Sequence, residues 1–404
     1  MATQLMPIEG IDNVSKDDAL TTRTRDSVSY RARDIINFDV SPTGMLDLRK
    51  GERLVSETPF KNIWQSPLHK DVFGTLQNEL VKINTSDWSY TSLGIVGGRV
   101  NFEVINNLVY VGTPQGLYTY NGKALEPLTI DTPAPPILIV SDDGALLKGQ
   151  YTVAISLLRG ELESGLSNSV SVDINVDDTI ERLYGGSFDI KLPYILDETI
   201  TGIRIYVSDR DGTQLRFHSD VPADTTSLKV VSVDNVSRVA SNGHLSPMVS
   251  GDFMSYWQGR LITASRNIIR FSQPLAYHLH DERYDYVQMP QRVTFLIGLD
   301  TGLWVGQVDH VVYLSGKDIQ SLDFNKKTAH APVPKSAIEI DADSVGRNLS
   351  NTGEKVCVWL AENGYVVGTA SGAIYETNAG RMKGISAKSG RSVRYDRRVI
   401  TKVT

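Results

Sequence analysis

The 404-residue chain has a single cysteine, Cys357. No disulfide can therefore form within it, and a cysteine-rich metal site is excluded. This cysteine usage fits a protein that folds in a reducing cytoplasm. Long apolar runs are also missing, since the longest ones, such as 135–140, are far too short to span a bilayer. The N-terminus has no basic region followed by an apolar run, so no signal peptide is expected and the sequence predicts a soluble protein.

The sequence also lacks the common catalytic motifs. It has no Gly-x-x-x-x-Gly-Lys-Ser/Thr phosphate loop, no His-Glu-x-x-His and no Gly-x-Ser-x-Gly nucleophile turn. The segment Ser208–Gln214 approaches the Ser-x-Asp-x-Gly-x-Thr-Trp boxes of sialidases, but its serine–aspartate spacing is wrong. No isolated pair of carboxylates stands out for acid–base chemistry. We therefore expect no enzyme activity and no cofactor.

Helical periodicity is nearly absent from the sequence. Short runs of β-branched and aromatic residues, broken by Gly, Asn, Asp and Pro, occur along the whole chain. This pattern is typical of β-strands separated by turns. Possible helices are limited to a turn or two near Lys16–Ala19 and Arg31–Ile36, so the chain is predicted to be almost entirely β.

One short pattern occurs five times: two alternating apolar runs around a few polar residues, with a small residue closing the first run. This is the pattern of a β-hairpin whose small residue allows close backbone approach. The gaps between successive small residues are 38, 152, 42 and 62 residues. Repeats near 40 residues that contain only strands indicate propeller blades, although hairpins in any β protein can look alike by chance. The small residues, predicted to be blade scaffold, are Gly74, Gly112, Ala264, Gly306 and Gly368.

The 152-residue gap begins with a proline-rich linker at Thr132–Pro136, which must be extended. Six or seven alternating strand-like runs follow within about 100 residues, as in a fibronectin III or immunoglobulin sandwich. Removing residues 133–236 shortens the gap to 48 residues and restores the blade period. We therefore predict an all-β fold in which a β-propeller-like domain of short hairpin blades carries an inserted β-sandwich. The expected order is an N-terminal arm (1–30), a first propeller segment (31–132), the sandwich (133–236), a second propeller segment (237–380) and a basic tail or closing strand (381–404).

The charge is unevenly distributed. The whole chain has a formal charge of −6, but from Arg381 onward it has eight Lys or Arg and one acid, so the tail carries +7 and the rest −13. A basic tail on an acidic body favours electrostatic contact with a partner, and a merely solvated tail is the alternative. The candidate docking residues are Arg391, Arg394, Arg397 and Arg398.

The stretch Ala276–Tyr286 combines two histidines with three acids. The histidines would share one face of a strand, and such a set can hold a divalent cation. No third ligand has a matching spacing, so an exposed interface loop is the favoured interpretation and no metal is predicted. The residues are His278, His280, Asp281, Glu282 and Asp285.

A second charged cluster lies near the N-terminus. Its simplest interpretation is a hairpin, in which the turn Ser41–Gly44 joins two strands whose charges alternate outward. A catalytic role for the cluster is the weaker alternative. Its residues are Asp39, Asp47, Arg49, Lys50 and Arg53.

Four stretches resemble bacteriophage tail proteins. Residues 33–55 (RDIINFDVSPTGMLDLRKGERLV) are similar to an N-x-D-x-x-x-x-G-x-L-x-x-R-x-G opening of that family. Residues 149–172 and 201–215 are similar to its inserted domain. Residues 246–279 resemble the blade that follows the insertion. The family includes the nozzle proteins of short-tailed phages, also called tail tubular or DNA-stabilisation proteins.

The resemblance implies a structural protein of the virion, assembled in the host bacterial cytoplasm. It would form a homo-oligomeric ring, expected to be a hexamer, that extends the portal DNA channel and retains packaged DNA. Its implied partners are the portal-side adaptor, tail-fibre or tail-tip proteins, and DNA that passes without sequence recognition. An acidic body suits such a channel, because carboxylates do not bind phosphates.

Two other functions compete with this one. A carbohydrate-binding adhesin or tail-tip receptor-binding module would use exposed aromatic residues such as Trp88, Tyr256 and Trp257. A propeller glycosidase would need a pair of acids in a recognisable setting, which the sequence does not offer.

Overall fold

The computed structural model describes residues 7–25, 28–41, 43–51, 53–175, 185–233, 236–327, 329–345, 353–395 and 398–404. Nearly all regular structure in these ranges is β-strand, and the helical turns among them are 3₁₀: η1 (Asp17–Leu20), η2 (Ile319–Ser321) and η3 (Ala342–Ser344). No helix within the described ranges is long and apolar enough to cross a membrane. The chain divides into two compact units, the first made of residues 1–114, 251–269 and 287–404 and the second of 115–250 and 270–286.

Five four-stranded sheets, each with its strands in sequence order, form the blades of the propeller-like domain. Neighbouring strands such as β7 and β8 pair antiparallel around short turns. The all-β prediction of hairpin blades is therefore confirmed. The sheets are β6 (Lys61–Gln65), β7 (Val72–Leu76), β8 (Glu79–Ile83) and β9 (Tyr90–Ile95); β10 (Asn101–Ile105), β11 (Leu108–Thr113), β12 (Gly116–Tyr120) and β13 (Leu125–Pro127); β23 (Phe253–Trp257), β24 (Arg260–Ser265), β25 (Ile268–Phe271) and β27 (Tyr286–Gln288); β28 (Val293–Leu299), β29 (Gly302–Gln307), β30 (Val311–Ser315) and β31 (Asp323–Lys327); and β32 (Ile338–Asp341), β33 (Lys355–Ala361), β34 (Gly364–Gly368) and β35 (Ile374–Glu376).

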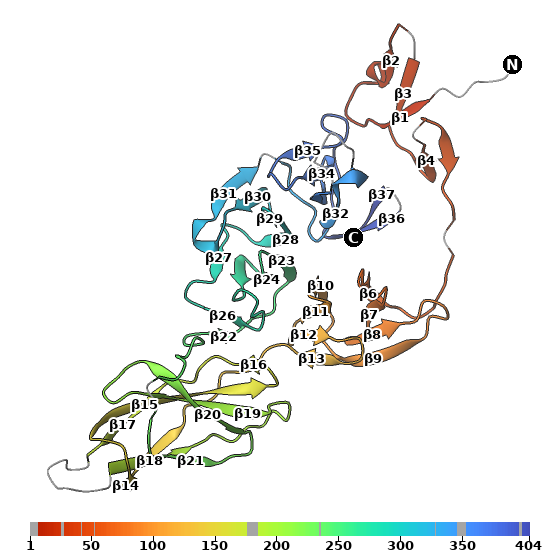
Figure 1. The fold of residues 1–404 in the computed structure, drawn as a ribbon. Coiled ribbons are helices and arrows are strands. Elements are labelled where there is room, and N and C mark those ends of the chain that lie inside the picture. The colour runs from red at the N-terminus through yellow and green to blue at the C-terminus, as the bar shows by residue number, and fades with distance from the viewer. Residues whose placement is uncertain are drawn as a thin grey trace. The chain divides into compact units, whose positions relative to one another are not determined.

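The first strands of these sheets all belong to the first unit and lie next to one another in blade order (Figure 1). Between β6 and β10, the rings of Trp64 and Phe102 stack with centroids 4.6 Å apart. Between β10 and β23, the Asn101 side chain donates a hydrogen bond to the carbonyl of Asp252 at 3.1 Å. Aromatic stacking and buried amide bonds of this kind fix neighbouring sheets in one register.

The same succession continues through the later blades. The amide of Gly298 on β28 donates to Ser255 Oγ on β23 at 2.9 Å. Between the fourth and fifth blades, the Phe295 and Trp359 rings lie 5.4 Å apart within a shared buried cluster. Each sheet thus buries its faces against the next, as propeller blades must.

A two-stranded hairpin occupies a sixth position, between the fifth blade and the first. It consists of β36 (Gly390–Tyr395) and β37 (Arg398–Val403), which pair antiparallel. The amide of Gly390 donates to the carbonyl of Pro334 next to β32 at 2.8 Å. On the other side, the Arg391 guanidinium donates to Asn62 Oδ1 on β6 at 3.0 Å. The C-terminal hairpin therefore closes a ring of six inner strands: β6, β10, β23, β28, β32 and β36.

The five predicted scaffold residues all lie within blade strands, four of them in the second strand of their sheet. Gly368 is the exception, because it lies in β34, the third strand. The fifth sequence repeat therefore matches a different hairpin of its blade. At two of the positions the missing side chain is a packing requirement. A Cβ on Gly306 would lie 2.3 Å from the Phe295 ring, and one on Gly368 would lie 2.5 Å from the Trp304 ring.

The N-terminal part of the first unit forms a three-stranded sheet and a separate hairpin. The predicted turn near Lys16–Ala19 is the 3₁₀ helix η1. The predicted helical turn at Arg31–Ile36 is wrong, because Arg31 and Ala32 continue strand β3, whose backbone groups pair with β1 and β2. The hairpin predicted around Ser41–Gly44 is confirmed as β4 paired with β5. The strands are β1 (Ile8–Ile11), β2 (Thr21–Arg23), β3 (Val28–Ala32), β4 (Phe38–Val40) and β5 (Leu46–Leu48).

The second unit contains the inserted β-sandwich, as predicted. All seven strand-like runs of the sequence are strands in the structure. One sheet has the order β14-β18-β21, and the other has the order β16-β15-β19-β20 with β17 also paired to β15. A buried cluster that includes Tyr151, Ile155, Phe188 and Ile205 forms the core from both sheets. The strands are β14 (Ile137–Gly144), β15 (Gly149–Arg159), β16 (Leu162–Glu163), β17 (Val170–Ile174), β18 (Gly185–Lys191), β19 (Gly202–Ser208), β20 (Leu215–Pro222) and β21 (Ser227–Val230).

The close packing at Gly368 leads to a test. We expect Gly368→Ala to lower the free energy of unfolding by about 2–3 kcal/mol, because the added methyl collides with the fully buried Trp304. Gly51→Ala is the matched control, since nothing lies within 4 Å of a Cβ at that position. Urea unfolding followed by tryptophan fluorescence measures both variants. Equal stability of the two would show that the interior of the blade is not packed as described.

Candidate functional site

The N-terminal ends of the six inner strands meet at one level. Hydrogen bonds connect neighbouring strands or their adjoining turns at that level all the way round, which shows that the inner strands start on the same side. Polar and charged side chains just before or at these strand starts are therefore brought together. The bonds are Asn62 Nδ2 to Gly98 O (2.8 Å), Asn101 Nδ2 to Asp252 O (3.1 Å), Val293 N to Arg266 O (2.7 Å), Lys335 N to Thr294 O (2.9 Å), Gly390 N to Pro334 O (2.8 Å) and Arg391 to Asn62 Oδ1 (3.0 Å).

Three cavities open at this level, all lined by residues of the first unit. The largest has a volume of about 760 Å³, and the others have volumes of about 430 and 590 Å³. All three share Arg99 and Asp252, so they form one continuous hollow. Their walls include six basic side chains, which we call the basic mouth: Arg99, Arg266, Arg292, Lys335, Lys388 and Arg391.

The basic mouth has more positive than negative charge. Of the acids lining the same cavities, Asp252 forms an ion pair with Arg99, and Glu362 lies 3.8 Å from His330. Burial lowers the pKa of Lys335, and the nearby guanidinium groups of Arg99, Arg391 and Arg292 lower it further. Such a shift is the expected result of like charges held close together.

Further along the inner strands lie two carboxyl groups. Glu103 on β10 lies near Glu339 on β32, which forms an ion pair with Lys355 on β33. Burial, reinforced by the charge of Glu339, raises the pKa of Glu103 to about 7. The inner-strand ring therefore has unbalanced positive charge at the strand starts, whereas farther in Glu103 is held near neutrality and Glu339 is paired with Lys355.

The shifted Glu103 predicts a pH dependence of stability. Because its pKa is raised in the folded state, Glu103 keeps a proton that the unfolded chain has already released between its ordinary pKa of 4.5 and about 7. This contribution to stability is complete below pH 4.5 and is lost as the pH rises to about 7. Relative to wild type, Glu103→Gln should therefore gain on the order of 1–3 kcal/mol over this window.

The measurement is the difference in unfolding free energy between variant and wild type at several pH values from about 4.5 to about 8. Glu57→Gln, at an exposed position of the first unit, is the control and should show a constant difference. A constant difference for Glu103→Gln as well would contradict the burial of this carboxyl.

The candidate docking arginines of the C-terminal tail contact this chain's own residues. Arg391 donates to Asn62, Arg394 pairs with Asp341 at 2.7 Å, and Arg398 pairs with Asp39 at 2.8 Å. Arg397 lies outside the described residues. Each of the three described arginines thus reaches a different part of the first unit.

The histidine-rich stretch belongs to the second unit and is not the exposed loop that the sequence favoured, because His278, His280 and Asp285 are buried. His278 Nε2 lies 2.9 Å from the carbonyl of Glu163, and His280, on β26 (Leu279–His280), is buried. Asp285 accepts from the Asp281 amide at 2.9 Å and also from the Gln273 side chain. Within the described residues no group of three His, Cys, Asp or Glu side chains is arranged to hold a metal ion.

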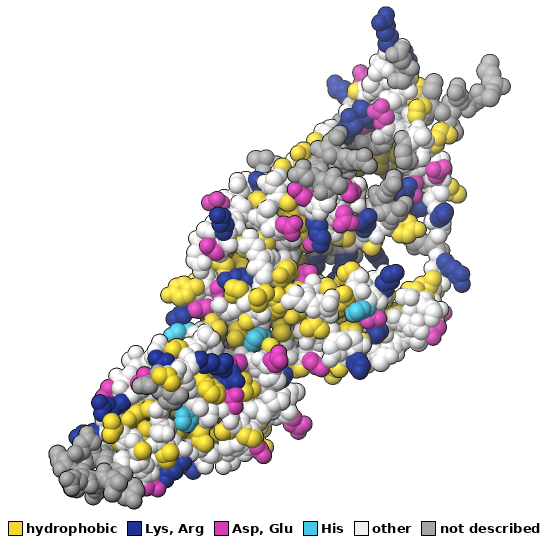
Figure 2. Space-filling view, in the orientation of Figure 1, with side chains coloured by type: hydrophobic (Ala, Val, Ile, Leu, Met, Phe, Trp, Pro, Cys, Tyr) yellow, Lys and Arg dark blue, Asp and Glu magenta, His cyan; other side chains and the backbone are white. Residues whose placement is uncertain are grey.

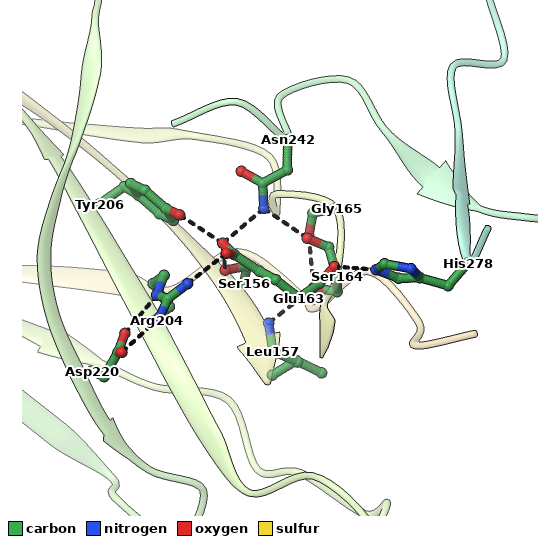
Figure 3. A network of polar contacts seen from close by, with 10 residues as sticks. All are labelled: Ser156, Leu157, Glu163, Ser164, Gly165, Arg204, Tyr206, Asp220, Asn242 and His278. Carbon is green, nitrogen blue, oxygen red and sulfur yellow. Dashed lines mark hydrogen bonds and ion pairs between the residues drawn. The ribbon is translucent and has the colours of Figure 1, made fainter. Parts of the chain in front are cut away.

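Sequence reasoning missed a polar network around Glu163 in the sandwich (Figure 3). Glu163 Oε1 accepts hydrogen bonds from Ser156 Oγ at 2.7 Å, Tyr206 Oη at 2.6 Å and Asn242 Nδ2 at 2.9 Å. Glu163 Oε2 accepts from Arg204 at 2.6 Å, and Arg204 also holds Asp220 through two bonds. A carboxylate with this many donors has its lone pairs occupied and is not poised as a base.

The same network ties the residues after the sandwich to its edge. The Asn242 side chain also donates to the carbonyl of Ser164 at 2.7 Å, and the Leu157 amide donates to Ser164 Oγ at 2.9 Å (Figure 3). The carbonyl of Glu163 lies against His278, whose pKa is lowered by burial, so the neutral ring donates there. No sequence signal marks this network, because its members lie on strands far apart in the chain. We call this network the Glu163 clamp, because its hydrogen bonds hold Asn242, which follows the sandwich strands in sequence, against Glu163 and Ser164.

Comparisons with known proteins concern only the fold. No family model matches the chain, and no curated protein matches it. Solved structures that align with it include Saccharomyces cerevisiae Sqt1 (11% identity, 84% of this chain and 77% of that chain, TM-score 0.31). Another is the N-terminal domain of Nup159 (7% identity, 85% and 72%, TM-score 0.29). At these TM-scores the alignments carry no argument, and the propeller-like fold is established by the chain's own sheets.

Proposed function

We propose that this protein is a non-catalytic structural component of a bacteriophage tail. It forms a nozzle or hub ring from several copies, expected to be six, that extends the portal DNA channel and retains packaged DNA. The ring contacts the portal-side adaptor and anchors tail-fibre or tail-tip proteins, and the DNA passes without sequence recognition. The resemblance of residues 33–55, 149–172, 201–215 and 246–279 to tail proteins supports this role.

The observation that carries the assembly proposal is the apolar surface of residues 36–55. We call this segment the arm below, and it is distinct from the N-terminal arm predicted at residues 1–30. Residues 36–55 hold a hairpin and an extended segment whose large hydrophobic side chains face solvent. Leu48 is 71% exposed and Leu54 is 78% exposed. A contiguous set of this kind marks a surface that another protein covers. The exposed side chains are Ile36, Phe38, Met45, Leu48, Leu54 and Val55.

The occupant of this surface is a second copy of the chain. A closed ring needs two different surfaces that meet head to tail. The C-terminal hairpin offers the second surface, because it has two paired strands where each of the five blades has four, and no third strand pairs with it among the described residues. Its outward side chains are apolar as well: Val393, Tyr395, Ile400 and Val403. A strand from another chain can pair with the unpaired backbone N–H and C=O groups of such an edge.

One of the aromatic residues that a receptor-binding module would need on its surface is buried. Trp257 is only 2% exposed, because it lies in strand β23 at the core of its blade. Trp88 and Tyr256 are half-buried. Hydrophobic side chains are exposed among charged ones across the visible face (Figure 2).

The assembly proposal predicts the effect of charges on the arm. Mass photometry of the wild-type protein, alone and with its portal-side neighbour, should show a ring of several copies. The double variant Leu48→Asp/Leu54→Asp should remain monomeric, since each charge would have to be buried between copies at a cost of several kcal/mol.

The matched control is Leu196→Asp/Leu275→Asp. These leucines belong to the second unit and are similarly exposed, at 85% and 74%. This variant should assemble like the wild type. A wild-type chain that stays monomeric under both conditions, or an arm variant that still forms rings, would overturn the proposal.

A further inference from the structure

We propose that the basic mouth is a binding site for a ligand that carries two or more phosphate groups. Neither the sequence pattern nor the tail proposal assigns a ligand to this place. The site lies within one chain, so the proposal does not depend on ring assembly.

The first support is the separate origin of the six cations. Arg99, Arg292 and Lys335 precede the inner strands β10, β28 and β32, whereas Arg266 lies in the turn between β24 and β25. Lys388 precedes β36, and Arg391 lies within it. Five separate segments of the chain thus direct basic groups to one hollow. The charge cannot be explained as a single solvated run, which is the usual meaning of clustered Lys and Arg.

The second support is the lack of compensating charge. The described residues that line the three cavities include six cations and only two acids, Asp252 and Glu362. Asp252 is already paired with Arg99, and Glu362 faces His330 rather than a member of the mouth. The closeness of Lys335 to three guanidinium groups is unfavourable without an anion.

The third support is an unused donor. Arg99 Nε is buried and has no hydrogen-bond partner among the described atoms. A buried polar group left in this way costs free energy, so it is normally satisfied by a ligand, an ion or water. Within the described part of the chain, the side chains of Arg292 and Lys335 likewise form no hydrogen bond or ion pair.

The composition of the mouth favours phosphate. Guanidinium groups match phosphate oxygens with paired hydrogen bonds, and lysines add point charges. The largest cavity, at about 760 Å³, has room for several phosphate groups.

Two sources supply this chemistry: a free oligophosphate, or the backbone of a single-stranded nucleic acid. Isothermal titration calorimetry with tripolyphosphate and with an eight-nucleotide single strand distinguishes them. Binding of tripolyphosphate alone assigns a free ligand, and binding of the oligonucleotide assigns a nucleic-acid backbone. In either case affinity should fall as salt concentration rises, because counterions are released.

The key variant is Arg292→Gln/Lys335→Gln, which should weaken binding about 10- to 100-fold. The control, Lys123→Gln/Lys148→Gln, removes two exposed positive charges from the second unit and should bind within about twofold of wild type. Lys335→Arg should retain binding, and unchanged circular dichroism shows that each variant folds. The proposal is overturned if neither probe binds the wild type, or if the key variant and the control bind equally well.

Discussion

Closure of the inner-strand ring is the constraint on which the rest of the first unit depends. A four-stranded sheet cannot bury both of its faces alone, so each blade is stable only between two neighbours. Five blades leave one position open, and the C-terminal hairpin fills it. The Arg391–Asn62 bond then joins segments 329 residues apart in sequence. The tail that the sequence marks as merely basic is therefore the segment that makes the first blade a neighbour of the last.

This closure also explains the distribution of charge. All six inner strands start at one level, so residues at the strand starts converge although nothing in the sequence groups them. The result is a basic mouth within a chain whose net charge is −6. The arginines of the tail are partly used for closure, since Arg391, Arg394 and Arg398 each bind a polar group of the same chain. The assembly proposal instead uses the apolar surface of the arm and the open edge of the hairpin.

Much of the fold could be predicted because it is local. Alternating runs bounded by turn residues identified all seven sandwich strands, and the repeated hairpin identified the five blades. The fifth repeat was matched to the wrong pair of strands, since β34–β35 and β11–β12 have the same apolar pattern. The mouth and the Glu163 clamp could not be predicted, because each joins single residues from distant segments. Closure was anticipated only as the alternative of a closing strand at 381–404, and its contacts with Asn62 and Pro334 were not. The burial of Trp257 could not be predicted either. The sequence around an aromatic residue in a strand does not show whether its side chain faces the core or the solvent.

Hydrogen exchange tests ring closure most directly, by comparing the full chain with a chain that ends at Ala387. Removal of the hairpin should raise amide exchange by an order of magnitude or more in β6 and β32, the two inner strands that border the sixth position. Strands β15 and β19 of the sandwich belong to the other unit and should exchange as before. Unchanged exchange in β6 and β32 would contradict the account, because the inner-strand ring would then be stable without its sixth member.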